Sequence, residues 1–117
     1  IDLIADWIDE GALEFLTNDL SYILPRKYRL YQNYPNPFNP STILKFDIPL
    51  DGLVNISIYD VRGIKISTLI NSFQNTGSLT LLWDGTDNAG RQVSAGLYFY
   101  IIQAGDFRDT KKMVLLK

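Results

Sequence analysis

The sequence contains no cysteine and no histidine. These absences exclude disulfide bonds, a thiolate nucleophile, an imidazole general base and the usual zinc ligand sets. A serine triad is excluded as well, because its serine needs a histidine to accept the proton. The 117 residues therefore lack the parts of most enzyme mechanisms, and we expect no enzymatic activity, no metal site and no cofactor.

Long apolar runs are also missing. No segment approaches the roughly 18 consecutive apolar residues of a membrane-spanning helix. The first residues lack the basic and then apolar order of a secretory signal peptide. Because the sequence begins at Ile1 rather than Met, we expect it to come from the end of a longer protein, with any export signal upstream.

Basic residues are absent from residues 1–24, which carry six Asp or Glu. Residues 25–117 carry eleven Lys or Arg and seven acidic residues, a net charge of +4, although the whole chain has −2. This contrast indicates two parts of different origin. The basic residues are spread over many segments and the pI is about 4.9, which argues against a nucleic-acid partner.

A short helix is predicted near the N-terminus. Leu3, Ile4, Trp7 and Ile8 repeat at the spacing of one helical face, and Gly11 is a suitable stop. Two turns of helix are marginal unless they pack on something else. We therefore interpret residues 1–27 as the last helix of a preceding domain followed by a connector.

From residue 28 the pattern is that of β-structure. Pro35, Pro37 and Pro40 exclude a helix or a central strand, so residues 34–41 are predicted to be a stiff, extended or turning lead-in. Alternating apolar segments separated by turn residues follow, at residues 44–48, 54–58, 64–68, 79–83, 96–104 and 110–116; the third is expected to fade into the polar residues 71–77. This spacing predicts an all-β fold, an immunoglobulin-like antiparallel β-sandwich of about seven strands over residues 28–117.

Residues 83–90 (W-D-G-T-D-N-A-G) form the most distinctive local run. Its oxygen-bearing side chains suggest calcium, but the order lacks the core and the closing Glu of an EF-hand loop. Asp-Gly and Asn-Ala-Gly provide the positive φ angles and side-chain hydrogen bonds of a tight loop. We favour this structural interpretation, with Trp83 in the core, because it is in phase with Leu79 and Leu81.

The tyrosines allow a carbohydrate-binding surface to be considered. Tyr98 and Tyr100 lie in a segment that is apolar on both faces, which favours burial between two sheets. Tyr28, Tyr31 and Tyr34 either cover a sheet edge or are exposed, and the sequence leaves both alternatives open.

The last seven residues, 111–117, form an apolar strand bracketed by lysines. One interpretation is an edge strand whose charges prevent aggregation. The other is a strand that a receptor captures by strand addition. The residues alone favour neither.

Five motifs, in order, resemble the type A C-terminal sorting domain of type IX secretion substrates. They are residues 32–42 (Q-N-Y-P-N-P-F-N-P-S-T), residues 58–60 (I-Y-D) with Gly63, residues 83–87 (W-D-G-T-D) with Gly90, residues 95–98 (A-G-L-Y) and residues 110–113 (T-K-K-M). The resemblance covers residues 28–117. Such domains are similar in fold to the immunoglobulin-like module of flagellar hook-capping proteins, which agrees with the predicted strands.

The resemblance implies a transport address rather than an enzyme. A cargo domain earlier in the chain would reach the periplasm by its own signal, and an outer-membrane translocon would recognise the C-terminal domain. A surface peptidase would then cut the connector before Tyr28. The expected location is secreted or at the cell surface, on the exterior of the outer membrane.

The resemblance also assigns expected roles to individual residues. The candidates for recognition by the translocon are Gly96, Tyr98, Lys111, Lys112, Met113, Val114, Leu115, Leu116 and Lys117. The residues expected to hold the fold are Pro35, Asn36, Pro37, Tyr59, Asp60, Gly63, Trp83, Asp84, Gly85, Asp87 and Gly90. Ile101 departs from the family, which more often has a polar or basic residue there.

Two alternatives remain beside the sorting role. The first is an immunoglobulin-like adhesion or subunit-contact module that stays on the mature extracellular protein. The second is carbohydrate binding through exposed Tyr or Trp side chains. Open sandwich edges also favour strand pairing, so self-association through edge strands is a further interaction to expect.

Overall fold

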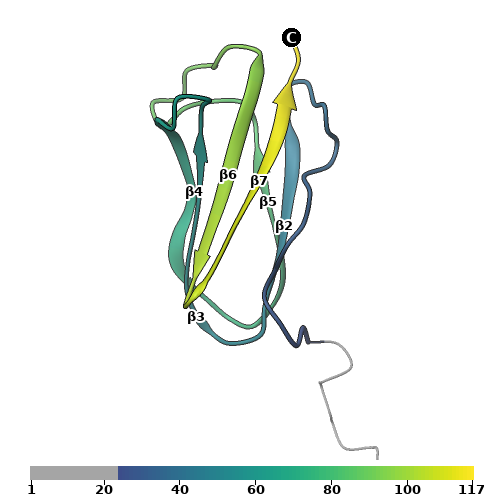
Figure 1. The fold of residues 1–117 in the computed structure, drawn as a ribbon, viewed down its shortest axis with the longest axis vertical. Helices are drawn as coiled ribbons and strands as arrows, with labels where there is room; N and C mark the ends of the chain where they lie inside the picture. The colour runs from purple at the N-terminus through teal and green to yellow at the C-terminus, as the bar shows by residue number, and fades with distance from the viewer. Residues whose placement is uncertain (1–23) are drawn as a thin grey trace, which may run out of the picture.

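A computed structural model describes residues 24–117, and in them two β-sheets pack face to face (Figure 1). The predicted helix and most of the connector lie outside the described residues. The seven strands of the described part are β1 (Arg29–Leu30), β2 (Thr42–Ile48), β3 (Gly52–Tyr59), β4 (Lys65–Gln74), β5 (Gly77–Trp83), β6 (Gly96–Ala104) and β7 (Phe107–Leu115). The predicted immunoglobulin-like antiparallel sandwich is confirmed.

The strands form a three-stranded sheet in the order β1-β2-β5 and a four-stranded sheet in the order β4-β3-β6-β7. All neighbouring strands in these sheets are antiparallel. The terminal strand β7 therefore lies at one edge of the larger sheet, and β4 lies at the other. Among residues 24–117 no helix is long and apolar enough to cross a membrane.

The core lies between the sheets because successive side chains of a strand point to opposite faces, and the inward-facing ones are mostly apolar. In β3, Val54, Ile56 and Ile58 are buried. Tyr98, Tyr100 and Ile102 of β6 are buried beside them, as are Trp83 at the end of β5 and Phe38 in the lead-in. The opposite face of β6, with Leu97, Phe99 and Ile101, is more accessible to solvent.

Several of the observed strands begin up to three residues before the expected ones, and three differences have a clear physical cause. β4 continues to Gln74, because its polar second half pairs with the start of β3 after a bulge opposite residues 56–57. β7 begins at Phe107, because a tight turn through Gly105 joins it to β6. The two-residue strand β1 was not predicted, since it is too short to produce an alternating pattern.

Candidate functional site

The terminal strand β7 has one buried and one accessible face. Met113 and Leu115 point into the core, whereas Lys112 is exposed and Val114 is half-buried. Tyr98 is buried in the neighbouring strand as well. Of the residues expected to be recognised, those with accessible side chains are Lys111, Lys112, Val114, Leu116 and Lys117.

The outer edge of β7 is partly covered by the lead-in segment (residues 32–41). The N–H of Phe38 donates to the carbonyl of Val114 at 3.0 Å, and the N–H of Leu116 donates to the carbonyl of Phe38 at 2.8 Å. Asn36 Oδ1 accepts the N–H of Val114 at 3.0 Å, and Gln32 Nε2 donates to the carbonyl of Lys112 at 2.7 Å. The C-terminal half of the edge therefore has partners for its backbone groups.

The same segment also bonds to the other sheet. Tyr34 exchanges two backbone hydrogen bonds with Ile43 of β2, at 3.0 and 2.9 Å. The lead-in thus bridges β2 and β7 and closes the seam between the sheets on this side. It runs along the sandwich to the end that carries the C-terminus (Figure 1). Its prolines lack an N–H, so side chains such as Asn36 and Gln32 supply part of the bonding.

Tyr100 and Asn33 hold the start of the lead-in. The Tyr100 hydroxyl donates to the carbonyl of Tyr31 at 2.7 Å and accepts the N–H of Asn33 at 2.7 Å. Asn33 Nδ2 donates to Thr42 Oγ1 at 2.9 Å and to the carbonyl of Pro35 at 3.1 Å. Sequence reasoning did not assign these roles. The available signal was that a tyrosine in a buried strand needs a partner for its hydroxyl.

The titration of Tyr100 gives a testable pH dependence. Burial raises the pKa of its hydroxyl to about 12, whereas an unfolded tyrosine titrates near about 10. The folded protein therefore keeps this proton to a higher pH, so the stabilisation is complete below about pH 10 and is lost between about pH 10 and 12. In urea unfolding across this range, we expect wild type to lose more stability than Tyr100→Phe.

Comparing wild type with Tyr100→Phe isolates the titration of Tyr100, because the variant keeps the two other tyrosines whose pKa is raised. Burial raises the pKa of Tyr98, and a hydrogen bond to Asp47 raises that of Tyr31. Equal loss of stability in the two proteins as the pH rises would contradict the assignment.

Aromatic side chains anchor the lead-in at the C-terminal end of the sandwich. The ring of Phe38 lies 5.7 Å from that of Trp83, and Tyr98 meets Trp83 edge-on at 5.5 Å. Gly85 has a φ of 78°, and a Cβ there would lie 3.1 Å from the carbonyl oxygen of Pro40 and 3.6 Å from Leu115. Only glycine fits this approach without strain.

The carboxylates of Asp87, in the loop between β5 and β6, and Asp60, in the turn between β3 and β4, accept hydrogen bonds from backbone N–H groups of the same loop. Asp87 Oδ1 accepts the N–H of Arg91 at 3.0 Å and of Ala89 at 2.9 Å. The hydrogen bond from Arg91 contributes most to a pKa of Asp87 below its usual value. Among residues 24–117, no group of three or more acidic side chains is close enough to hold a metal ion.

Asp60 is held in a similar way. Its Oδ1 accepts the N–H of Arg62 at 2.9 Å and of Ile64 at 3.0 Å, in a turn that contains Gly63 at a φ of 83°. Desolvation acts to raise the pKa of Asp60, but hydrogen bonds from the Arg62 side chain and the two backbone groups outweigh it, and the pKa is lowered.

Four of the five sequence motifs meet at one end of the molecule, and the fifth, residues 110–113, runs along β7 towards it, with Met113 opposite Tyr98. Phe38 contacts β7 and Trp83, Gly85 lies against Leu115, and Tyr98 packs on Trp83. Asp60 and Tyr98 together line a surface hollow at this end. Residues far apart in the chain thus build a single corner around the C-terminus.

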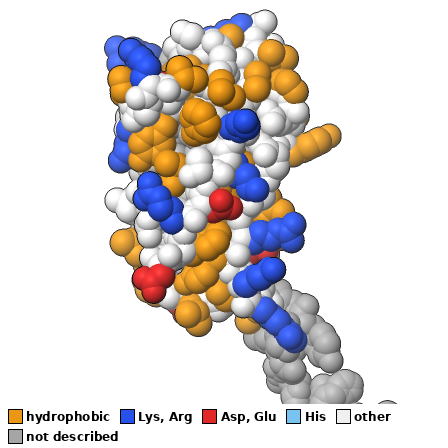
Figure 2. All heavy atoms as spheres, viewed as in Figure 1, with side chains coloured by type: hydrophobic (Ala, Val, Ile, Leu, Met, Phe, Trp, Pro, Cys, Tyr) orange, Lys and Arg blue, Asp and Glu red, His pale blue; other side chains and the backbone are white. Residues whose placement is uncertain are grey.

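Basic side chains lie along β7 and beside Tyr31, from the middle of the sandwich to the end opposite this corner. β7 carries Arg108, Lys111 and Lys112, while Arg29 and Lys45 lie 4.4 and 4.8 Å from the centre of the Tyr31 ring. Figure 2 shows Lys and Arg side chains across the face that carries β6 and β7, with hydrophobic side chains between them. The arrangement suits a partner that offers acidic and apolar groups.

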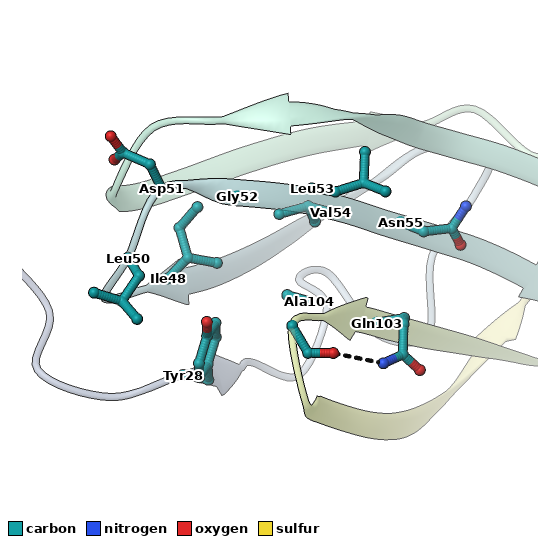
Figure 3. Close-up of a pocket in the computed structure, with 11 residues that line it drawn as sticks. Tyr28, Ile48, Leu50, Asp51, Gly52, Leu53, Val54, Asn55, Gln103 and Ala104 are labelled. Atoms are coloured by element: carbon teal, nitrogen blue, oxygen red, sulfur yellow. Dashed lines mark hydrogen bonds between the residues drawn. The ribbon is translucent and has the colours of Figure 1, made fainter.

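A hollow of about 490 Å³ lies at the opposite end of the sandwich, near the start of β3 and the end of β6 (Figure 3). Its lining is mostly apolar and includes Tyr28, Leu50 and Leu53. The carboxylate in its lining, Asp51, accepts the N–H of Thr76 at 2.6 Å. Its mostly apolar lining favours an apolar group over a charged one.

Comparisons with known proteins agree with this architecture. The β-sandwich resembles dimeric latent PorU from Porphyromonas gingivalis, with a TM-score of 0.61 and 20% identity over 76% of this chain and 9% of that one. FlgD from Xanthomonas campestris, a hook-capping protein essential for flagellar assembly, has a TM-score of 0.52 and 23% identity over 78% of this chain and 63% of that one. PorZ from P. gingivalis, a surface component of the type IX secretion system, has a TM-score of 0.51 and 18% identity over 75% of this chain and 11% of that one.

These identities demonstrate a shared fold, and the chain spans less than two thirds of each of these three proteins. A comparison with curated proteins gave no match. The family model of the FlgD Ig-like domain matches residues 43–106. Since this match covers more than half of the sequence, the chain belongs to the FlgD Ig-like domain family.

Proposed function

We propose that residues 28–117 are a type A C-terminal sorting domain, which directs an attached cargo protein across the outer membrane by the type IX pathway. Residues 1–27 would be the end of the cargo domain and the connector. The observation that carries the proposal is the convergence of three motif residues, Phe38, Trp83 and Tyr98, which pack together in the core beside Leu115 of the terminal strand. The domain acts by being recognised, not by catalysis.

The comparisons support the proposal through the fold. Two of the similar structures are PorU and PorZ, and PorZ is described as a component of the type IX system. The family match adds the Ig-like domain of FlgD, a protein of flagellar hook capping. The partners we propose are the outer-membrane translocon and a surface peptidase, and the proposed destination is the cell surface or the medium.

The two faces of β7 would have different roles, one in packing and one in recognition. Met113 and Leu115 hold the strand in the core, while Lys112, Leu116 and Lys117 remain accessible. Residues 108–111 form the part of the edge that the lead-in does not reach, since its first hydrogen bond to β7 is to the carbonyl of Lys112. Among the described residues, the outward carbonyl of Thr110 has no hydrogen-bond partner. A translocon strand would pair here and read the lysine charges, as in other cases of strand addition.

A matched pair of charge reversals tests the role of the terminal strand. Lys112 and Lys65 are exposed lysines on the two edge strands of the same sheet. In the full-length protein expressed in its native host, we expect Lys112→Glu to leave most of the cargo in the periplasm. Lys65→Glu should reach the surface normally, because it lies at the other edge. Cell fractionation and surface labelling provide the measurement.

Both variants must first give the same thermal unfolding midpoint as wild type, so that misfolding does not explain retention. Normal surface delivery of Lys112→Glu would reject recognition through this lysine. Normal surface delivery of the cargo after residues 28–117 are deleted would reject the sorting function itself.

A second candidate is a module that remains on the mature protein and contacts another subunit. The outer face of the smaller sheet carries three adjacent exposed apolar side chains, Tyr34, Ile43 and Leu82, whose backbones pair across neighbouring segments. Exposed apolar patches often mark contacts between proteins. Under this alternative the mature protein keeps residues 28–117.

A further inference from the structure

The two edge strands of the larger sheet differ in how they are protected. β7 carries Arg108, Lys111 and Lys112, and the lead-in covers half of its edge. β4 has a single charged residue, Lys65, at its first position. From Ile66 to Trp83 the sequence contains no Asp, Glu, Lys or Arg. Natural edge strands normally carry charges or prolines, or are covered by another segment, which prevents pairing with other strands. β4 has less of this protection than β7.

Only the first half of the β4 edge is covered. The N–H of Thr68 donates to Asn88 Oδ1 at 3.0 Å, and the N–H of Asn88 donates to the carbonyl of Ile66 at 3.1 Å. Further along, residues 70–74 pair with β3 on one side. Within residues 24–117 no hydrogen bond covers the outward backbone groups of this stretch.

Apolar side chains lie beside the open stretch. Phe73 of β4 is opposite Leu53 of β3, and their side chains are 64% and 62% exposed. Leu50, also exposed, lines the hollow together with Leu53 (Figure 3). The adjoining strands β3 and β6 contain no charged residue. The outer face of the sheet near β4 is therefore neutral and partly apolar, which is typical of a contact surface.

We infer that a second copy of this chain pairs with residues 70–74 of β4 in antiparallel orientation and joins the two larger sheets across a twofold axis. The open stretch is centred on Ser72, so residue 71 of each copy would lie opposite residue 73 of the other. The two Phe73 side chains would then be diagonal neighbours, which is within reach of aromatic rings.

The charges favour a second copy at this edge over the other edges. Self-pairing of β4 opposes no like charges, whereas β7 carries three basic residues against one acidic residue, Asp109, so its self-pairing would bring two strands of net positive charge together. β5 is uncharged as well, but Lys45 and Asp47 lie opposite Thr80 and Ser78 on its sheet. A twofold contact also closes on itself, so it gives a dimer rather than a fibre. The inference is independent of the proposed sorting role, because β7 stays accessible.

Sedimentation of the 117-residue chain over a wide concentration range tests this inference. We expect a reversible monomer–dimer equilibrium, and we expect Phe73→Lys to weaken it by about tenfold or more. Val61→Lys is the matched control, because Val61 is a similarly exposed apolar side chain in the turn that joins β3 to β4, at the end of β4 away from residues 70–74. Asn71→Lys is a second variant for the case in which Phe73→Lys does not fold.

Hydrogen exchange locates the contact. Amides in residues 70–74 should exchange more slowly as the concentration rises, while those in residues 108–112 should not change. A chain that stays monomeric at several hundred micromolar would overturn the inference. A dimer whose protection appears at β5 or β7, or which Phe73→Lys does not weaken, would overturn it too.

Discussion

Phe38→Ala is expected to lower the free energy of unfolding by about 3–5 kcal/mol. Phe38 is only 2% exposed, and its ring packs against Trp83 while its backbone bonds to β7. The substitution leaves a cavity at the corner where the motifs meet. Because domains of this size have about 5–15 kcal/mol of stability in total, a large fraction of the variant should unfold on mild heating. Urea unfolding followed by fluorescence measures the loss.

Phe73→Ala is the matched control, since it removes the same side-chain atoms from a position that is 64% exposed. At low protein concentration its stability should lie within about 0.5 kcal/mol of wild type. Equal losses in the two variants would mean that Phe38 does not anchor the lead-in.

Met113→Asp is expected to destabilise the protein by about 3–5 kcal/mol or more, because it places an unpaired carboxylate in the core. Met113 is fully buried and lies opposite Tyr98 in the hairpin of β6 and β7. A short side chain cannot extend its charge to solvent as a lysine does. Circular dichroism at rising temperature should show a strongly lowered midpoint or no folded state.

Lys112→Asp introduces the same group one residue away, on the exposed side of the strand. Its effect should stay within about 1 kcal/mol, the range of strand propensities. A comparable loss in both variants would contradict the division of β7 into a buried and an accessible face. The pair also separates residues that hold the strand from those available for recognition.

Regular alternation made the sandwich predictable from the sequence. In β3, every second residue from Val54 to Ile58 is apolar and buried, so local pattern and tertiary packing agree. The extension of β4 was not predictable in this way. Its second half is polar, and it is a strand only because it pairs with residues 52–55 of β3.

The candidate site was harder to predict because its contacts join distant residues. The proline pattern predicted a stiff lead-in, but nothing local indicated that Asn36 would bond Val114, which is 78 positions away. The same holds for Tyr100 and Asn33, 67 positions apart. For β7, the lysines stood out in the sequence, whereas the burial of Met113 and Leu115 became apparent only with the second sheet in place.

The intact mass of the mature protein, recovered from the cell surface and the medium of its native host, tests the sorting function most directly. Our account predicts a protein that has lost residues 28–117 through cleavage in the connector before Tyr28. A surface protein that still ends at Lys117 would contradict removal of the domain, and a retained contact module would then be the better description.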